Sequence, residues 1–360
     1  MEEFSCKTKL ISGTGSIAVL AQLKARRLFL VTDPYFMKDG TAHEIVRASG
    51  AEHHEIFDAV MPDPTVELAA RGAARVKEYQ PDLMVALGGG SAMDCAKARR
   101  YFSGVSCPMA AIPTTSGSGS EVTDFAILTH EGIKHPLVDE KLRPDLAILD
   151  DHLLQKLPRS LIADSGFDVL AHALEACAAA KGGSITDALS REAFRMAFSA
   201  LPGSFAGDKH KRLEIHKAAS MAGLAFSQAG LGLCHALSHA LGGAFHVPHG
   251  RLNAILLPAV LECNAAAALD KYAALARAAG FSASSDTMAV RSLKNSLVQL
   301  RRDLELPQTL AQAGVDLKKL RQQEQRILEA ALADPCCETN PVKPEPHMLR
   351  SILSQVSGRG

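Results

Sequence analysis

The first 157 residues alternate between short apolar segments and segments with helical periodicity. Leu83–Leu87 and Met109–Pro113 are unbroken apolar runs, which is typical of strands buried on both faces of a sheet. Thr65–Tyr79 is predicted to be helical, with turn residues just before it. The predicted strands are Leu28–Thr32, His54–Phe57, Leu83–Leu87, Met109–Pro113 and Leu146–Asp150. Because strands separated by helices pair in parallel, we predict an α/β domain built on a parallel sheet.

The pattern changes after Leu157 and Pro158, where alanine and leucine recur at helical spacing and strand signals become scarce. Pro202–Lys211, which contains proline, two glycines and charged residues, is predicted to be a loop within the helical part. The predicted helices are Asp168–Ala180, Ile185–Leu201, Leu213–Gln228, Leu233–Ala244, Ala254–Asn264, Leu269–Ala279, Thr287–Asp303, Leu317–Ala333 and Glu345–Val356. We therefore predict two domains, an α/β domain at 1–157 and an all-helical domain at 158–360.

Composition narrows the classes of protein to consider. Lys plus Arg and Asp plus Glu both number 39, and this balance argues against a nucleic-acid or membrane-surface partner, which would favour a basic excess. The chain has no run of 18 apolar residues, and its acidic start lacks an apolar signal core. The eight cysteines show no CxxC spacing, so we expect free thiols and a cytoplasmic protein.

Histidines gather in one stretch of the second half. Gly232–Gly250 contains His235 and His239, four apart on a predicted helix, and His249, which follows Pro248 and is predicted to lie in a loop. The same stretch contains His246. A single helical histidine is usually structural, but burying several ionisable rings without a ligand is costly.

Upstream, Asp168 and His172 also stand four apart on a predicted helix, so their side chains share one face. One carboxylate together with several imidazoles is a donor set suited to iron(II) and also to zinc. The sequence therefore predicts a divalent-metal site in the helical domain.

The first half contains two segments that can bind phosphate. Gly88–Ser91 lies between a predicted strand and a predicted helix, where exposed backbone N–H groups favour an anion. Asp94 follows on that helix and is expected to accept N–H bonds from the turn. Thr114–Ser120 is rich in hydroxyl groups and follows another strand. The structural alternatives are a tight turn without a ligand for the first segment and a flexible linker for the second.

Asp33 directly follows a predicted strand. An acid at this position can accept hydrogen bonds from a ribose 2′-hydroxyl and repel a 2′-phosphate, which favours NAD over NADP. A helix cap explains the same residue equally well.

These motifs, taken together, resemble the iron-containing (group III) alcohol dehydrogenases, whose relatives include glycerol dehydrogenase and dehydroquinate synthase. The resemblance covers essentially the whole chain, and within the family it is strongest to the propanol dehydrogenases of bacterial microcompartments. It is carried by the segments Val31–Asp33, Pro62–Thr65, Gly88–Lys97, Ile112–Thr123, Asp168–Ala176, Gly232–Gly250 and Asp334–Pro341. The resemblance implies a dehydroquinate synthase-like fold with NAD(H) bound in the first domain.

The resemblance also implies roles for particular residues. The implied metal ligands are Asp168, His172, His235 and His249. His239 is implied to lie behind the ligands or on the substrate side, with the substrate oxygen protonated through water or through His239, and His246 is implied to be structural or to lie at the edge of the cleft. The implied cofactor-binding residues are Asp33, Asp63, Gly89, Gly90, Ser91, Asp94, Thr114, Thr115, Ser118, Ile127 and Lys134. Many family members carry asparagine at the position of Asp63, so that contact departs from the pattern.

The implied activity is the reduction of a short-chain aldehyde such as propionaldehyde by NADH, with Fe(II) as the expected metal and Zn(II) as the alternative. A homodimer and an association with a microcompartment are further expectations. One alternative is a reductase of an anionic aldehyde such as sulfoacetaldehyde. A dehydroquinate synthase-like lyase would need a cationic pocket, and the metal motifs carry no concentrated Lys and Arg set. The remaining alternative is a non-catalytic assembly protein on the same fold.

Overall fold

The computed structural model describes residues 3–130, 133–281 and 283–358. These residues form two compact units. The first unit is Cys6–Leu157, and the second contains the chain from Pro158 onwards together with the residues just before Cys6. Each unit is described separately below.

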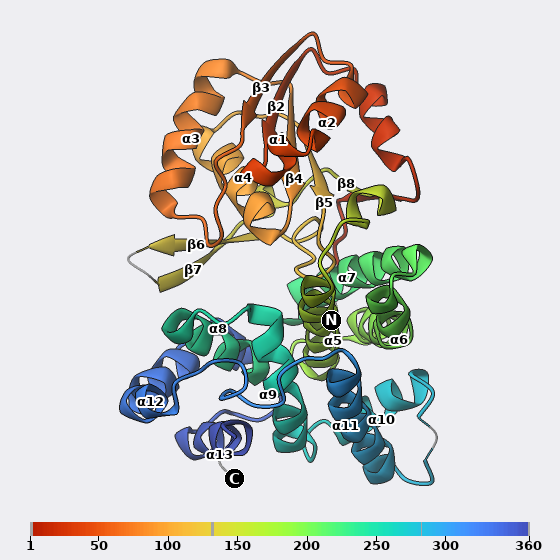
Figure 1. Cartoon of the computed structure of the whole chain (residues 1–360), viewed down its shortest axis with the longest axis vertical. Helices are drawn as coiled ribbons and strands as arrows, with labels where there is room; N and C mark the ends of the chain where they lie inside the picture. Colours follow the sequence, from red (N-terminus) through yellow and green to blue (C-terminus); the bar gives the residue numbers. More distant parts are fainter. Residues whose placement is uncertain (1–2, 131–132, 282, 359–360) are drawn as a thin grey trace. The chain divides into compact units, whose positions relative to one another are not determined.

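The first unit is built on a six-stranded sheet with the order β1-β8-β5-β4-β2-β3, in which every pairing is parallel (Figure 1). The prediction of an α/β domain with a parallel sheet is confirmed. The sheet strands are β1 (Lys9–Ser12), β2 (Arg27–Val31), β3 (His53–Phe57), β4 (Leu83–Gly88), β5 (Met109–Pro113) and β8 (Leu146–Leu149). The α-helices are α1 (Pro34–Lys38), α2 (Thr41–Ser49), α3 (Val66–Tyr79) and α4 (Gly90–Ser103), with 3₁₀ turns η1 (Ser16–Leu23), η2 (Glu140–Leu142) and η3 (Asp151–Leu154).

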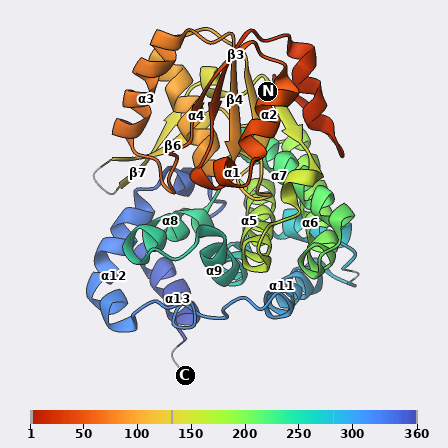
Figure 2. The same ribbon diagram turned by 45° about the horizontal axis from the view of Figure 1, so that its top comes forward.

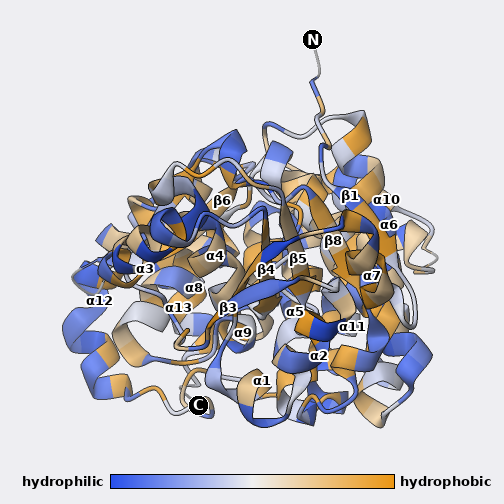
Figure 3. Ribbon diagram, turned by 90° about the horizontal axis from the view of Figure 1, so that it is seen from above, coloured by the Kyte–Doolittle hydropathy of each residue, from blue (hydrophilic) through white to orange (hydrophobic). Residues whose placement is uncertain are grey.

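Alternate residues of each strand face opposite layers of helices. In β2, Leu28 and Leu30 pack with Ile45 of α2 in one apolar cluster, while Phe29 and Val31 belong to a second cluster that includes residues of α3 and α4. Both faces of the inner strands are therefore buried, which explains their unbroken apolar sequences. The edge strand β3 is largely hydrophilic instead (Figure 3).

Five strands and α-helices of this unit were not predicted. The strand β1 is short and mostly exposed, and α1 and α2 are brief helices that follow β2. An antiparallel hairpin of β6 (Phe125–His130) and β7 (Ile133–Val138) follows the serine-rich segment. Ile45 of α2 and Leu128 of β6 are buried, but the longest of these elements has 9 residues, which is too short to show a clear hydrophobic periodicity.

Every element described in the second unit is helical, as predicted (Figure 2). Among the described residues, no helix is both long enough and apolar enough to cross a membrane. The helices are α5 (Arg159–Ala178), α6 (Ser184–Ala206), α7 (Lys209–Ala229), α8 (Leu233–Phe245), α9 (His249–Asn264), α10 (Leu269–Ala278), α11 (Asp286–Asp303), α12 (Leu317–Leu332) and α13 (Pro346–Val356), with the 3₁₀ turn η4 (Pro335–Thr339).

The predicted loop at Pro202–Lys211 is wrong. Helix α6 continues through Pro202 to Ala206, and α7 begins at Lys209. The connection is only Gly207, in the left-handed region at φ 103°, and Asp208, whose carboxylate caps α7. The turn signals of the sequence are thus real, but two residues suffice to make the turn.

A second proline lies inside α9 and is accommodated by a buried arginine. Because Pro258 has no N–H, the carbonyl oxygen of Ala254 loses its partner within the helix. Arg301 of α11 donates to this oxygen at 3.0 Å and to that of Ile255 at 3.1 Å. Burial lowers the pKa of Arg301 to about 10. The arginine therefore joins α11 to α9, the helix that carries His249.

Candidate metal centre and nucleotide-binding loops

Three helices of the second unit bring together the residues predicted to bind a metal. Asp168 and His172 lie one turn apart on α5, and both are buried. His235 lies in the first turn of α8 and is also buried. His249 was predicted to lie in a loop, which is wrong, because it is the first residue of α9. Proline restricts the residue before it but not the helix after it, so Pro248 precedes the helix rather than interrupting it.

The donor atoms converge on one point. Asp168 Oδ1 lies 3.8 Å from His235 Nε2 and 3.5 Å from His249 Nε2. The His172 ring stacks on the His235 ring at 4.5 Å, and ligand atoms of Asp168, His172 and His235 all lie within 4.8 Å of one another. Metal bonds of about 2.0–2.2 Å separate neighbouring ligands by roughly 3–3.5 Å. The donor set therefore fits a divalent ion after small side-chain adjustments.

Asn253 lies among the same donor atoms, and it was not identified from the sequence. Its Nδ2 lies 2.7 Å from Asp168 Oδ1, 3.3 Å from His235 Nε2 and 3.2 Å from His249 Nε2. It stands one helical turn after His249 on α9, a spacing that offered a usable signal.

A glycine and an ion pair hold α9 against α5. A Cβ on Gly250 would lie 2.0 Å from the carbonyl oxygen of Asp164, so only glycine permits this approach. The next residue, Arg251, binds the Asp164 carboxylate at 2.9 and 3.1 Å. The contact places His249 beside Asp168, one turn further along α5.

Glu175 is a buried acid that sequence reasoning missed. Its Oε2 lies 2.6 Å from His235 Nδ1, and its Oε1 accepts the N–H of Cys234 at 2.6 Å. Burial raises the pKa of Glu175 to about 8, although backbone N–H groups at the start of α8 oppose the shift. Glu175 follows Asp168 by seven residues and His172 by three, so it lies on the same face of α5. This spacing was the signal that could have revealed it.

Burial also acts on His235. It holds the pKa of the ring well below the usual range, and the neighbouring His172 and His249 lower it further. With Nδ1–H donated to Glu175, the neutral ring presents the lone pair of Nε2 toward Asp168. Neutral imidazole oriented by a carboxylate is the form that binds a cation.

His239 lies beside the donor set but has a different partner. Its ring stacks on His249 with centroids 5.1 Å apart, and its Nδ1 lies 2.8 Å from Asp334 Oδ2. His246, in contrast, is exposed and ends α8 in the left-handed region at φ 55°.

The late motif Asp334–Pro341 holds the start of α8. Asn340 Oδ1 accepts the N–H of Leu233 at 3.1 Å, and Thr339 Oγ1 donates to the carbonyl of Leu231 at 2.6 Å. A Cβ on Gly232 would lie 2.8 Å from both Asn340 Oδ1 and Glu175 Oε1. The side chains of Asn340 and Glu175 thus pack directly against the start of α8, so there is no room for a side chain at Gly232.

In the first unit the glycine turn and the hydroxyl-rich loop are in contact. β4 ends at Gly88 and α4 begins at Gly90, as expected for a turn that directs N–H groups outward. A Cβ on Gly89 would lie 3.2 Å from Thr115 Oγ1, and one on Gly90 would lie 3.2 Å from Ser118 Cβ. Ser91 lies in the first turn of α4, and Thr114 donates its N–H to Gly88 at 2.9 Å. The two loops therefore form one surface.

Asp33 lies next to this surface. β2 and β4 are neighbours although β3 comes between them in the chain, so the sheet reverses its strand order at this point. Ligands of open α/β sheets bind in the crevice at such a reversal, at the carboxyl ends of the strands. Asp33 Oδ1 accepts the N–H of Tyr35 at 2.9 Å and caps α1. Because the cap bonds of Asp33 are made by Oδ1, its other oxygen, Oδ2, is in a suitable place to accept a hydrogen bond from a ribose.

Asp94 and Lys97 tie the hydroxyl-rich loop to α4. Asp94 accepts bonds from Ser120 Oγ at 2.8 Å and from the N–H of Ile127 at 3.1 Å, and both partners lie outside the glycine turn that it was expected to support. Lys97 is fully buried and donates to Ser120 Oγ, to both oxygens of Thr123 and to the carbonyl of Phe125. Burial lowers the pKa of Lys97 to about 8. Sequence reasoning assigned no role to this lysine, because a lysine on a helix usually reaches solvent.

The remaining predicted cofactor residues lie around the hairpin. Asp63 is exposed in the left-handed region at φ 55°, which aspartate and asparagine tolerate better than most residues. This accounts for either type at the position. Lys134 belongs to β7 opposite Thr129, and its side chain lies outside the described part of the chain.

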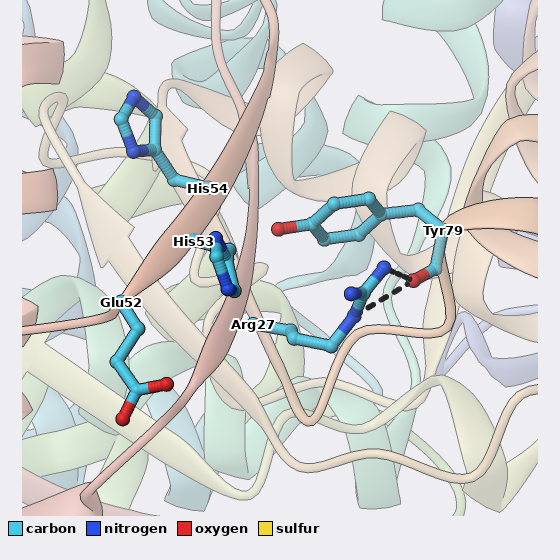
Figure 4. A pocket seen from close by; sticks show the side chains of 5 residues that line it. All are labelled: Arg27, Glu52, His53, His54 and Tyr79. Atoms are coloured by element: carbon cyan, nitrogen blue, oxygen red, sulfur yellow. Dashed lines mark hydrogen bonds between the residues drawn. The ribbon is translucent and has the colours of Figure 1, made fainter.

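A surface pocket of the first unit is unrelated to these loops. It is lined by Arg27, Glu52, His53, His54 and Tyr79 (Figure 4). Arg27 and His53 are the first residues of their strands, so the pocket lies at the opposite end of the sheet from the glycine turn. We therefore do not assign it to the cofactor.

Comparison with known proteins agrees with both units. Residues 7–151 match the model of the iron-containing alcohol dehydrogenases, and residues 162–357 match that of the C-terminal part of the same family. The chain is 38% identical to 1-propanol dehydrogenase PduQ of Salmonella typhimurium, over 99% of this chain and 100% of that protein. It is 34% identical to the NADPH-dependent butanol dehydrogenase of Clostridium saccharobutylicum, over 95% and 94%.

Solved structures agree as well. An iron-containing alcohol dehydrogenase from Thermococcus thioreducens superimposes with a TM-score of 0.91 at 31% identity, covering 99% of this chain and 100% of that one. The chain belongs to the iron-containing alcohol dehydrogenase family. It is therefore an enzyme, an alcohol dehydrogenase, and the alternative of a non-catalytic assembly protein on this fold is not supported.

Proposed function

We propose that the chain reduces a short-chain aldehyde such as propionaldehyde to its primary alcohol, using NADH and a divalent metal ion. The observation that carries the proposal is the convergence of one carboxylate and three imidazoles from α5, α8 and α9. The full-length similarity to a 1-propanol dehydrogenase supports the substrate class.

The proposed ligands are Asp168, His172, His235 and His249. A divalent ion held there supplies a Lewis acid that stabilises the negative charge developing on the substrate oxygen. The chain contributes neutral imidazole, since burial depresses the pKa of His235 and Glu175 accepts a hydrogen bond from its Nδ1–H. Fe(II) is the proposed metal on account of the family, although the intrinsic affinity order favours Zn(II) over Fe(II) at such a site.

The proposed cofactor site is the surface made by the glycine turn and the hydroxyl-rich loop. NADH supplies the hydride that passes to the carbonyl carbon. The N–H groups of Gly89, Gly90 and Ser91 would hold the pyrophosphate, and the hydroxyls of Thr114, Thr115 and Ser118 would add hydrogen bonds. The proposed contacts of Asp63, Ile127 and Lys134 extend this site.

The preference for NAD(H) rests on Asp33. Its carboxylate lies beside the turn, since a Cβ on Gly88 would come within 3.6 Å of Asp33 Oδ2. A negative charge at this position repels a 2′-phosphate. The similarity to an NADPH-dependent butanol dehydrogenase makes the coenzyme a property to be measured directly.

The test is a substrate panel. The protein is purified without oxygen, reconstituted with Fe(II), and assayed for oxidation of NADH or NADPH with acetaldehyde, propionaldehyde, lactaldehyde, dihydroxyacetone and sulfoacetaldehyde. We expect propionaldehyde with NADH to give the largest kcat/KM. If sulfoacetaldehyde gives the largest value, the proposed substrate is wrong and the anionic alternative replaces it. If no carbonyl is reduced by protein that holds both metal and NADH, the proposed reaction is wrong.

A further inference from the structure

Asp334 is held in one orientation by two different partners. It caps η4, where its Oδ1 accepts the N–H of Cys336 at 2.8 Å. Its other oxygen, Oδ2, lies 2.8 Å from His239 Nδ1. The carboxylate is mostly buried, at 15% side-chain exposure, and the His239 side chain is 29% exposed. An acid fixed in this way determines how the ring beside it is protonated.

The tautomer of His239 follows from this contact. A carboxylate accepts, so the ring must donate through Nδ1–H, and in the neutral ring Nε2 then carries the lone pair. The ring plane is also constrained, because it stacks on His249 at an angle of 15°. His235 lies one helical turn before His239 on α8, and Glu175 of α5 fixes its ring in the same way. α8 therefore presents two histidines with Nε2 available, and only one of them lies among the metal donors.

We propose that Asp334 is a positioning residue that holds His239 with Nε2 available for proton transfer to and from the substrate oxygen. The inference rests on the proposed function. In aldehyde reduction, hydride from NADH adds to the carbonyl carbon, the C=O electron pair moves to oxygen, and oxygen takes the proton from protonated His239 Nε2. The ring then regains a proton from solvent. Alcohol oxidation runs the same steps in reverse, with neutral Nε2 as the acceptor.

A second metal site is the competing interpretation of this group. Ligand atoms of His239, Asp334 and Cys336 lie within 4.8 Å of one another. The direct contact of 2.8 Å between Asp334 and His239 is a normal hydrogen-bond length and shorter than the separation of roughly 3–3.5 Å between ligands of one ion. Burial also raises the pKa of the Cys336 thiol, whereas a metal ligand is a thiolate. The geometry favours the hydrogen-bonded pair.

The experiment is a double-mutant cycle on the metal-reconstituted protein, with Asp334→Asn, His239→Gln and the double variant. Asparagine at 334 can donate to Nδ1 and so favour the wrong tautomer. We expect Asp334→Asn to lower kcat about 10- to 100-fold with little change in KM. We expect His239→Gln to lower kcat at least as much, and the double variant to be no slower than His239→Gln. Asp334→Glu should recover part of the lost kcat.

Matched measurements separate positioning from misfolding. Asp316→Asn removes a comparable helix cap at the opposite end of α12 from Asp334, since Asp316 caps α12 through the N–H of Lys318, and it should keep the wild-type kcat. Metal content and NADH affinity should be unchanged in all variants.

Three results would overturn the proposal. The first is wild-type kcat in Asp334→Asn, and the second is independent losses that multiply in the double variant. The third is two metal ions in the wild type and one in Asp334→Asn, which would establish a second metal site. These results leave the proposed function intact when the wild type reduces aldehydes. A metal-loaded wild type that binds NADH and reduces nothing would remove both proposals.

Discussion

Glu175 and His235 are joined by a hydrogen bond of 2.6 Å between carboxylate Oε2 and ring Nδ1, in the buried interface of α5 and α8. The bond leaves Nε2 directed toward Asp168. Carboxylates in this position orient a metal-binding imidazole and raise its basicity. The strength of metal binding should therefore depend on a residue that touches no metal.

We predict that Glu175→Gln weakens metal binding by about 10- to 100-fold. The amide keeps the size of the side chain but is a poorer acceptor for Nδ1–H. Metal affinity is measured by titrating metal-free protein against a chelating indicator. The affinity for NADH, which is proposed to bind in the other unit, serves as the internal control. Unchanged metal affinity in Glu175→Gln would contradict this role.

Two histidines should respond differently to removal. His249→Ala is expected to give a folded protein with little bound metal, since it deletes a proposed ligand. His239→Ala is expected to retain the metal, because its ring nitrogen Nδ1 is bound to Asp334 and not to the donor set. Elemental analysis of both variants, purified identically, makes the comparison. Equal loss of metal in both would show that the ligand assignment is wrong.

Lys97 should make the stability of the protein depend on pH in the alkaline range. Burial lowers its pKa from 10.5 to about 8, so between these values the unfolded chain binds more protons than the folded chain. The free energy of unfolding contributed by this group therefore rises with pH across that window. Relative to Lys97→Met, the wild type should gain up to about 3 kcal/mol between about pH 8 and pH 10.5.

Denaturant titration at several pH values measures the effect of Lys97. Lys77→Met, at an exposed position of α3, is the matched control and should differ from the wild type by an amount that does not change with pH. A pH-independent difference between the wild type and Lys97→Met would refute the prediction.

Arg301 should contribute to stability through the proline of α9. Arg301→Met leaves the carbonyl oxygen of Ala254 without a donor in a buried position. We expect a loss of about 1–3 kcal/mol in the free energy of unfolding. Arg302→Met, at the exposed neighbouring position, should change stability by less than about 0.5 kcal/mol. Similar losses in the two variants would rule out the carbonyl contacts as the cause.

Asp33→Asn should relax the choice of coenzyme. Asparagine keeps an oxygen for the N–H of Tyr35 but removes the charge that repels a 2′-phosphate. We expect NADPH to bind about 10-fold more tightly, with little change for NADH. Asp39→Asn, which alters the carboxylate that accepts the N–H of Thr41 at 3.0 Å, is the control. If both variants bind NADPH as the wild type does, Asp33 does not set the preference.

The sequence allowed the α/β and helical units to be predicted because their inner elements are apolar in a regular pattern. β4 and β5 are buried on both faces and appear as unbroken apolar runs. The hairpin of β6 and β7 was not predicted, although Ala126 and Leu128 of β6 are buried. It is also held by strand pairing and by the bond from the N–H of Ile127 to Asp94, and local patterns do not reveal such tertiary hydrogen bonds.

The candidate metal centre was predicted from residue types and helical spacing, and its supporting residues were missed. Asp168, His172 and His235 have the chemistry of ligands, so they attract attention. Glu175 and Asn253 share the same helix faces but act through hydrogen bonds that only the packed structure defines. Residues that orient ligands can be found from the sequence when acids and amides at the same helical spacing are considered together with the histidines.

The most direct test of the account follows metal and activity in one sample. The wild type, purified without oxygen, is assayed for NADH-linked reduction of propionaldehyde, stripped with a chelator, assayed again, and then reconstituted with Fe(II). We predict that activity is lost with the metal and returns with about one ion per chain. Full activity in the metal-free protein would contradict the central claim, as would a reconstituted protein that binds NADH and reduces no aldehyde.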